Sequence, residues 1–290
     1  MKKTPIQSVT DSCRCFDSLS GILVVLLLTV FPLLAQGQRS TWSLPLYKET
    51  VRVFSVAGGK SFARDTYLSA SRYEGFMGGF EYDNWSGGRP EKIFEYGRIH
   101  ADLSFGYLEN RLGGGRTLEL IGSAFFAKMW HAVDYEMCDL LVGPAAMLKL
   151  GALYNMNNGN NPANAEDYLA AGVCVDNTFR YRLFKYPMAL QATLWIPLIG
   201  VGVEPDYDQT YWYMYRYNDY WKTVNFITPF NNTAFSQQIS LILPVRGDRF
   251  KIGYSYDILT NSIGGHSRSI SNNTFTIGYV KKLQTKEWGR

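Results

Sequence analysis

Long stretches of strict two-residue alternation constrain the fold of this chain more than any other feature. In the segment 99–107 every second residue is apolar, and the residues between them are histidine, aspartate, serine and glycine. Apolar residues also recur at alternate positions in 188–198, 239–245, 250–258 and 275–279. Successive side chains of a β-strand point to opposite faces, whereas a helix repeats every three to four residues. The pattern therefore predicts an all-β protein.

Turn residues separate the alternating segments at 112–115, 183–187 and 246–248, and the last link is short enough for an antiparallel hairpin. Several segments reach the roughly 9–11 residues with which a tilted strand crosses a bilayer. Short links alternate loosely with long ones, as in barrels with short periplasmic turns and longer outer loops. We predict an antiparallel up-and-down transmembrane β-barrel of about ten to twelve strands. Eleven segments are candidate strands: 48–57, 72–84, 92–109, 116–131, 140–154, 167–180, 187–202, 207–216, 234–246, 249–259 and 272–283.

The overall composition agrees with a barrel that has one polar and one apolar face. Hydrophobic residues make up 46% of the 290 residues, yet the mean hydropathy is only −0.15. A bundle of membrane helices would be far more apolar, whereas a barrel needs only one apolar face on each strand. The net charge of +4 comes without a basic block, so no nucleic-acid partner is expected.

The N-terminal region 1–37 has the three parts of a secretory signal peptide. Lys2 and Lys3 are positively charged, 22–34 is an apolar run, and 35–37 supplies small residues for cleavage after Gly37. The apolar run is shorter than the roughly 20 residues of a spanning helix, which makes an N-terminal membrane anchor the weaker alternative. We expect a signal peptide at 1–37, a single barrel domain at 38–290, and location in the outer membrane.

An aromatic-rich stretch at 206–221 is the one segment that suggests a binding surface. Eight of its sixteen residues are Tyr or Trp. Three interpretations stay open: aromatics at the membrane rim, a loop folded inward against the lumen wall, and a platform on which a glycan or another flat molecule stacks. On the third interpretation the candidate ligand-binding residues are Tyr211, Trp212, Tyr213, Tyr215, Tyr217 and Trp221.

The sequence contains no catalytic or metal-binding motif on which an activity can be based. His100 and Asp102 share the predicted polar face of one strand, and a serine from a neighbouring strand would complete a nucleophilic site. Two polar residues on one face are, however, ordinary in a barrel lumen. Cys138 and Cys174 permit a disulfide in an exported protein, and their pairing depends on an unknown register. We expect no enzyme activity, no cofactor and no metal.

Two groups of residues carry a resemblance to a known family. The first is 65–69 followed by 72–75, and the second is the C-terminal succession 239–245, 246–248, 250–257 and 274–282. These residues resemble a group of exported proteins from Bacteroidetes, known only as a domain of unknown function. The resemblance implies an outer-membrane barrel without an assigned role and supplies no catalytic residues. The chain departs from common outer-membrane proteins because 283–290 follow its last strand.

Several functions fit a barrel of this kind. The first is a pore or solute-binding channel, and the second is a structural or surface protein whose lumen is filled by side chains. A soluble periplasmic β-barrel or β-sandwich that binds a ligand is the main alternative, and a barrel enzyme acting on envelope lipid ranks last. The expected partners are outer-membrane lipid and lipopolysaccharide, the outer-membrane assembly machinery, and a small-molecule or glycan ligand.

Overall fold

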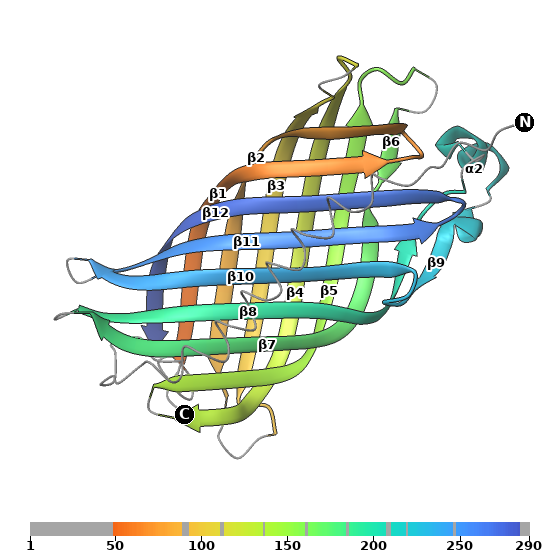
Figure 1. Cartoon of the computed structure of the whole chain (residues 1–290). Helices are drawn as coiled ribbons and strands as arrows, with labels where there is room; N and C mark the ends of the chain where they lie inside the picture. Colours follow the sequence, from red (N-terminus) through yellow and green to blue (C-terminus); the bar gives the residue numbers. More distant parts are fainter. Residues whose placement is uncertain are drawn as a thin grey trace, which may run out of the picture.

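The computed structural model describes residues 49–284 except 89–92, 111–112, 136, 160–161, 184–185, 207–209, 219 and 246–247. The signal peptide expected at 1–37 lies outside the described residues. One twelve-stranded sheet dominates the fold, and ten of its strands are long (Figure 1). The long strands are β1 (Glu49–Asp65), β2 (Ser69–Gly87), β3 (Tyr96–Glu109), β4 (Arg116–Tyr135), β5 (Cys138–Asn155), β7 (Asp167–Leu183), β8 (Tyr186–Val203), β10 (Asn232–Val245), β11 (Asp248–Ile263) and β12 (His266–Gln284).

The sheet closes on itself as an antiparallel barrel. β1 pairs with β12 along its full length, from Glu49 opposite Gln284 to Asp65 opposite Arg268. Around the ring, each long strand pairs with the long strands that precede and follow it in the sequence. β8 and β10 pair with each other although the segment 204–231 separates them in the sequence. Two short strands, β6 (Ala163–Ala165) and β9 (Val224–Ile227), add to β5 and β8. The prediction of an all-β, up-and-down barrel is confirmed, with ten strands in the closed ring.

One of the eleven candidate strands is wrong. Within 207–216 the structure has a helix, α2 (Tyr211–Tyr217), followed by a short 3₁₀ helix, η1 (Tyr220–Thr223). Thr210 caps the start of α2, where its hydroxyl accepts a hydrogen bond from the Tyr213 amide at 3.2 Å, and Asn218 ends it with a left-handed φ of 56°. Tyr and Trp favour strands because they pack well on a sheet. The caps override that preference in this loop.

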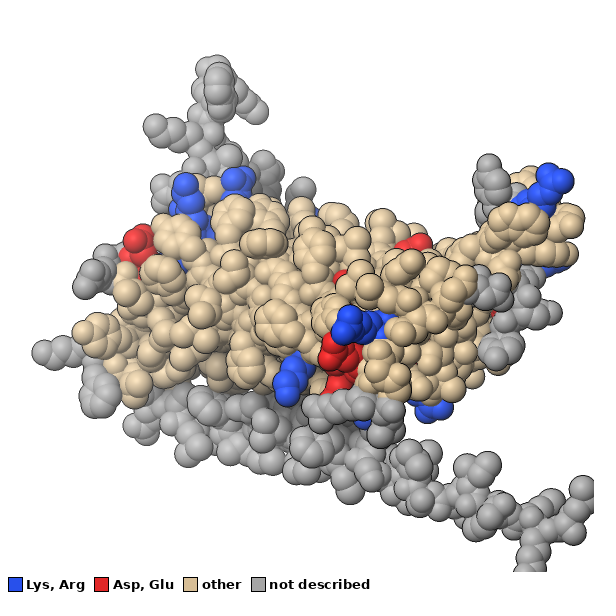
Figure 2. All heavy atoms as spheres, turned by 90° about the horizontal axis from the view of Figure 1, so that it is seen from above, with Lys and Arg blue, Asp and Glu red and all other residues tan. Residues whose placement is uncertain are grey.

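The two faces of the wall follow the alternation that the sequence predicts. On β3 the side chains of Arg98, His100 and Asp102 point into the lumen, while Ile99 and Leu103 face outward. The outward face of the barrel carries most of the exposed large hydrophobic residues. Figure 2 shows one side of it as wide stretches free of charge, with the charged side chains in separate groups. No helix in the described part of the chain is long and apolar enough to span a membrane.

The two ends of the barrel differ in their connections. At one end, here called the terminal end, lie Glu49, Gln284 and the links 88–95, 136–137, 184–185 and 246–247. The opposite end, here called the loop end, has the two longest connections, 156–166 and 204–231. The predicted hairpin is confirmed because Val245 pairs with Asp248. Side chains fill the lumen at both ends, since one buried apolar cluster lies toward each of them.

Glycine is required where neighbouring strands approach most closely. A Cβ atom at Gly75 would overlap the carbonyl oxygen of Tyr107 on the adjacent strand, and one at Gly143 would overlap that of Lys128. The absence of a side chain at these two positions permits the close approach of the strands. Not every glycine has this role, because an added Cβ at Gly159 would meet nothing within 4 Å.

Gly75→Ala is expected to destabilise the barrel by about 1–3 kcal/mol, since the wall has to shift to admit the methyl group. Urea unfolding of the purified protein, followed by the loss of the compact form on a gel, measures this effect. Gly159→Ala is the matched control and should change stability by less than about 0.5 kcal/mol. Equal effects of the two substitutions would contradict the role assigned to Gly75.

Candidate functional site

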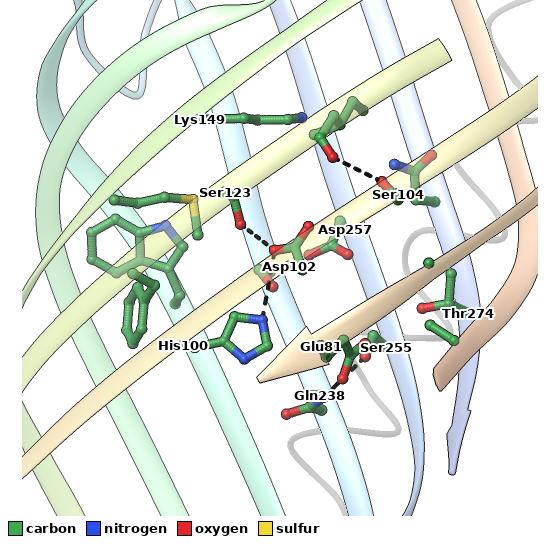
Figure 3. A pocket seen from close by; sticks show the side chains of 18 of the residues that line it. Glu81, His100, Asp102, Ser104, Ser123, Lys149, Gln238, Ser255, Asp257 and Thr274 are labelled. Carbon is green, nitrogen blue, oxygen red and sulfur yellow. Dashed lines mark hydrogen bonds and ion pairs between the residues drawn. The ribbon is translucent and has the colours of Figure 1, made fainter. Parts of the chain in front are cut away.

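A cavity of about 140 Å³ lies in the lumen between the two apolar clusters. Figure 3 shows the labelled side chains converging on it from several strands. At about 10–15 Å³ per water, it has room for roughly ten water molecules. The space therefore suits a small molecule or the polar head of a larger one. Its polar lining residues are Glu81, Arg98, His100, Asp102, Ser104, Ser123, Lys149, Tyr168, Thr193, Gln238, Ser255, Asp257, Asn272 and Thr274.

A buried ion-pair network fixes the wall between the cavity and the terminal end. The Arg98 guanidinium donates to Asp83 Oδ1 at 2.8 and 3.0 Å, and Lys251 Nζ donates to Asp83 Oδ2 at 3.0 Å. All three side chains are buried. Arg98 also stacks over the Trp85 ring at 4.9 Å. One carboxylate thus holds two cations from different strands, and these groups are committed to the structure.

His100 lies between two carboxylates and does not contact a serine hydroxyl among the described residues. Its Nδ1 is 3.1 Å from Asp83 Oδ1, and its Nε2 is 3.6 Å from Asp102 Oδ1. The Ser123 hydroxyl donates to Asp102. A nucleophilic serine needs a base within hydrogen-bond reach of its own proton. The cluster is therefore arranged to hold charge and hydrogen bonds around the cavity rather than to activate a nucleophile.

Three carboxylates on the cavity wall form no ion pair with a lysine or arginine of the described chain. Glu81 accepts a hydrogen bond from Gln238 Nε2 at 3.3 Å. Asp102 accepts from Ser123, and Asp257 accepts from the Ser236 hydroxyl. Lys149 also lines the cavity, but it pairs with Glu166. All three are half-buried, and because a carboxylate withdrawn from water is costly without a counter-charge, this wall favours a cationic ligand.

Two further polar atoms on the same wall have no hydrogen-bond partner. The indole Nε1 of Trp195 is a donor without an acceptor, and Asn272 Oδ1 is an acceptor without a donor. Their side chains are 3% and 7% exposed, and both line the cavity. Buried polar groups in folded proteins are nearly always paired. These two atoms are therefore polar groups that the described chain itself leaves unsatisfied beside the cavity.

A second buried network closes the lumen at the loop end. Arg268 Nη2 lies 3.0 Å from Glu204 Oε1, and its Nε lies 3.2 Å from Asp65 Oδ2. Glu204 also contacts His266 Nε2 at 2.6 Å and accepts from Asn261 at 3.2 Å. Glu204 is the first residue after β8, so this network ties the base of the 204–231 segment to the barrel.

Helix α2 contributes one side to this closure and leaves its other side exposed. The Tyr211 hydroxyl accepts from the Ala165 amide and donates to Asn164 Oδ1, both at 2.7 Å. Burial raises the pKa of Tyr211, which keeps the phenol protonated as that donor. Tyr211 packs against the loop-end cluster and Met214 is buried. The inward-folded interpretation therefore fits this side of the helix.

The remaining candidate ligand residues lie apart from the cavity. Trp212, Tyr213, Tyr217 and Trp221 are exposed, and the rings of Tyr213 and Tyr217 lie 4.5 Å apart. The side chain of Tyr215 lies outside the described part. A stacking platform formed by the exposed rings stays a prediction.

The cysteines and the histidines outside the cavity are explained by structural contacts. Cys138 and Cys174 are both free thiols, so the two do not form a disulfide. His131, Asp134 and Asp139 offer atoms within 4.8 Å of one another, as a metal ion would require. However, His131 Nδ1 contacts Glu95 at 2.6 Å and Asp139 pairs with Arg180. Ion pairs therefore account for this grouping.

A family model described as a protein of unknown function (DUF3316) matches residues 22–287, so the chain belongs to that family. The prediction of a family without an assigned function is confirmed, and the bacterial phylum named with it stays a prediction. No curated protein matches the chain.

Three solved outer-membrane proteins are similar in structure at very low sequence identity. The outer membrane protease OmpT from Escherichia coli is 7% identical with a TM-score of 0.43, and the match covers 84% of this chain and 100% of OmpT. The COG4313 outer membrane channel from Pseudomonas putida F1 is 9% identical with a TM-score of 0.37, covering 83% and 97%. The translocator domain of the autotransporter NalP from Neisseria meningitidis is 9% identical with a TM-score of 0.34, covering 95% and 99%.

The sequence predicts part of the cavity and misses the rest. The polar inner face expected from Asp102, Ser104, Ser255 and Asp257 lines the cavity. Lys251 also faces inward but pairs with Asp83. The missed residues are Glu81, Asn272 and Trp195. Trp195 lies between apolar positions of the alternating segment 188–198, so alternation was a usable signal for it. Glu81 and Asn272 lie outside the alternating segments, and alternation does not distinguish residues that line the cavity from residues that fill the lumen.

Proposed function

We propose that this chain is an outer-membrane β-barrel that binds a small cationic molecule inside its lumen. The three carboxylates without lysine or arginine partners on the wall of one cavity carry this proposal. A small ammonium compound supplies the counter-charge for Glu81, Asp102 and Asp257.

The surface of the barrel supports the location in the outer membrane. Large apolar residues are exposed on the outward faces of strands all round the ring, from Phe54 on β1 to Phe275 on β12. Soluble proteins rarely expose apolar patches beyond a few hundred Å², whereas lipid requires such a band. The terminal end has the shorter links and would lie in the periplasm, and the loop end would face outside.

Binding is favoured over a permanently open pore because apolar clusters lie in the lumen on both sides of the cavity. It is favoured over a purely structural barrel because a lumen filled by side chains would not keep a cavity beside three carboxylates that have no lysine or arginine partner. Fractionation of cells and gel mobility before and after boiling test the location. Recovery in the outer membrane, with a faster band before boiling, is expected, and recovery in the soluble periplasm would contradict it.

Ethylammonium is expected to raise the midpoint of thermal unfolding of the purified barrel, because a ligand that binds only the folded state stabilises it. Asp102→Asn should weaken the binding about tenfold or more, since a hydrogen bond to a charged group contributes about 1.5–3 kcal/mol. Asp248→Asn, an exposed change of the same type at the terminal end, should leave the binding unchanged. Equal stabilisation by ethylammonium and acetate would contradict a cation site.

A further inference from the structure

In the described part of the chain, the hydrogen-bond ladder of the barrel wall is interrupted between β8 and β10. The two strands pair from Ile242 opposite Ala189 to Ser236 opposite Trp195. Beyond Trp195, β8 next pairs with β9, beginning at Gly200 opposite Ile227. Residues 196–199 of β8 and 232–235 of β10 therefore face each other without any described ladder pair.

The break arises from four extra residues between β9 and β10. From Ile227 to Ser236 the chain advances nine residues, while the facing segment of β8 from Trp195 to Gly200 advances five. The insertion 228–231 forms its own turn. Thr228 donates its amide to Asn231 Oδ1 at 2.8 Å, and Asn232 donates to the Thr228 carbonyl at 2.9 Å. The break is thus built into the chain and held by a defined turn.

The lumen cavity reaches this break. Its lining includes Trp195, the last paired residue of β8, together with Ala234 and Ser236 of β10. It also includes Phe235, an outward residue of β10 within the break, whereas its partner Ile258 lies across the continuous β10–β11 ladder. Outward residues Phe80 and Leu103 line it elsewhere, but there the β2–β3 ladder is continuous.

The outer rim of the break is apolar. Ile196, Leu198 and Phe226 are exposed around it, and Phe230 at the tip of the insertion is 99% exposed. Irregular backbone at membrane depth is tolerated only where it is buried in protein or lines a solvated cavity. The unpaired edges at 196–199 and 232–235 meet this condition because the cavity lies behind them. A wall that is apolar outside and polar inside suits an amphiphile.

We propose that the break between β8 and β10 is a lateral portal through which a single-chain amphiphile with a cationic head enters the lumen from the membrane. The head binds at Glu81, Asp102 and Asp257, while the chain lies in the portal between Ile196 of β8 and Phe235 of β10. The proposal rests on the proposed function for the membrane location and for the nature of the head. The entry route itself follows from the strand pairing.

A cysteine beside the portal reports the route of entry. Ser236→Cys is placed in a protein whose native cysteines are replaced by alanine, and the barrel is reconstituted in phosphatidylcholine vesicles. We expect a maleimide with a dodecyl chain, supplied in the bilayer, to label this position at least about tenfold faster than a sulfonated, water-soluble maleimide. Faster labelling by the sulfonated reagent would mean entry from the aqueous ends and would overturn the portal.

Sealing the portal gives the second measurement. Deleting 228–230 leaves Asn231 as the single residue between Ile227 and Asn232, so that β9 and β10 can continue as one strand beside β8. Ile227 and Asn232 are both buried, and one residue between them lets both keep facing inward. Labelling of Ser236→Cys by the dodecyl reagent should then fall at least about tenfold, whereas replacing 228–231 with Gly-Ser-Gly-Ser should leave it unchanged. Labelling that survives in the folded deletion variant would overturn the proposal.

Controls separate this proposal from the proposed function. Ser269→Cys, exposed on the outer face of β12, should react with the dodecyl reagent equally fast with and without the deletion. If ethylammonium binds but the dodecyl reagent shows no preference, the cavity site stands and the portal fails. If the dodecyl reagent enters but ethylammonium does not bind, the portal stands and the cationic head fails. A deletion variant that does not fold leaves the comparison of the two reagents on the intact barrel decisive.

Discussion

Asp83→Asn is expected to lower the free energy of unfolding by about 3–5 kcal/mol, because it leaves two buried cations without their shared counter-ion. Arg98 keeps a distant carboxylate, Asp176, at 3.9 Å, and hydrogen bonds to Thr193 and Gln238. Lys251 keeps the Gln238 side-chain oxygen at 3.2 Å. None of these remaining partners replaces the negative charge of Asp83 beside both cations. Urea unfolding in detergent, followed by gel mobility, measures the loss.

Two further variants show whether the loss comes from uncompensated charge. Adding Lys251→Met to Asp83→Asn removes one of the stranded cations and should recover part of the lost stability, because apolar replacement of buried ions is often neutral or stabilising. Asp248→Asn makes the same chemical change at an exposed site and should cost less than about 1 kcal/mol. If Asp83→Asn were as mild as Asp248→Asn, the network would not hold the wall together.

The barrel could be predicted from the sequence because the pattern that determines it, the alternation of apolar and polar residues, is local. Alternation in segments such as 99–107 and 250–258 fixes which side chains share a face, and a one-residue slip would turn all of them over. The short link before Asp248 determines its own hairpin. Closure needs no separate signal, since long strands joined in sequence order leave only the β1–β12 edge to pair.

The error at 207–216 shows where local reasoning stops. Alternating tyrosines satisfy the period of a strand, but the segment lies in a connection of the loop end with no partner strand to pack on. The caps Thr210 and Asn218 were present in the sequence. They were weaker signals than the aromatic pattern because a cap contributes only about 1 kcal/mol.

The cavity and the portal could not have been predicted from the sequence, because both depend on the pairing register of the strands. Asp83 and Lys251 are 168 residues apart in sequence, and only strand order brings them together. The portal depends on counting pairs on both sides of 228–231, and this count exists only once β8 is known to pair with both β9 and β10. Non-local pairing carries most of the functional information in this fold, although local alternation determines most of its shape.

Arg268→Met is expected to destabilise the loop end by about 3 kcal/mol, because it leaves Asp65 and Glu204 buried without their common cation. The estimate lies at the low end of such effects because His266 stays on Glu204 at 2.6 Å and Asn164 stays on Asp65 at 2.7 Å. The larger consequence is local. Glu204 anchors the start of 204–231, so its release should open this segment before the barrel itself unfolds.

Trypsin added to intact cells measures this opening directly. Arg216 and Lys222 are exposed in the segment, and the proposed orientation places both outside the cell. The native barrel should resist, while Arg268→Met should be cut within 204–231 into two fragments that separate only after boiling. Arg64→Met removes an exposed arginine beside Asp65 and should leave the protein resistant. Cleavage of both variants alike would show that Arg268 does not hold the loop, and protection of both in cells but not in detergent would reverse the orientation.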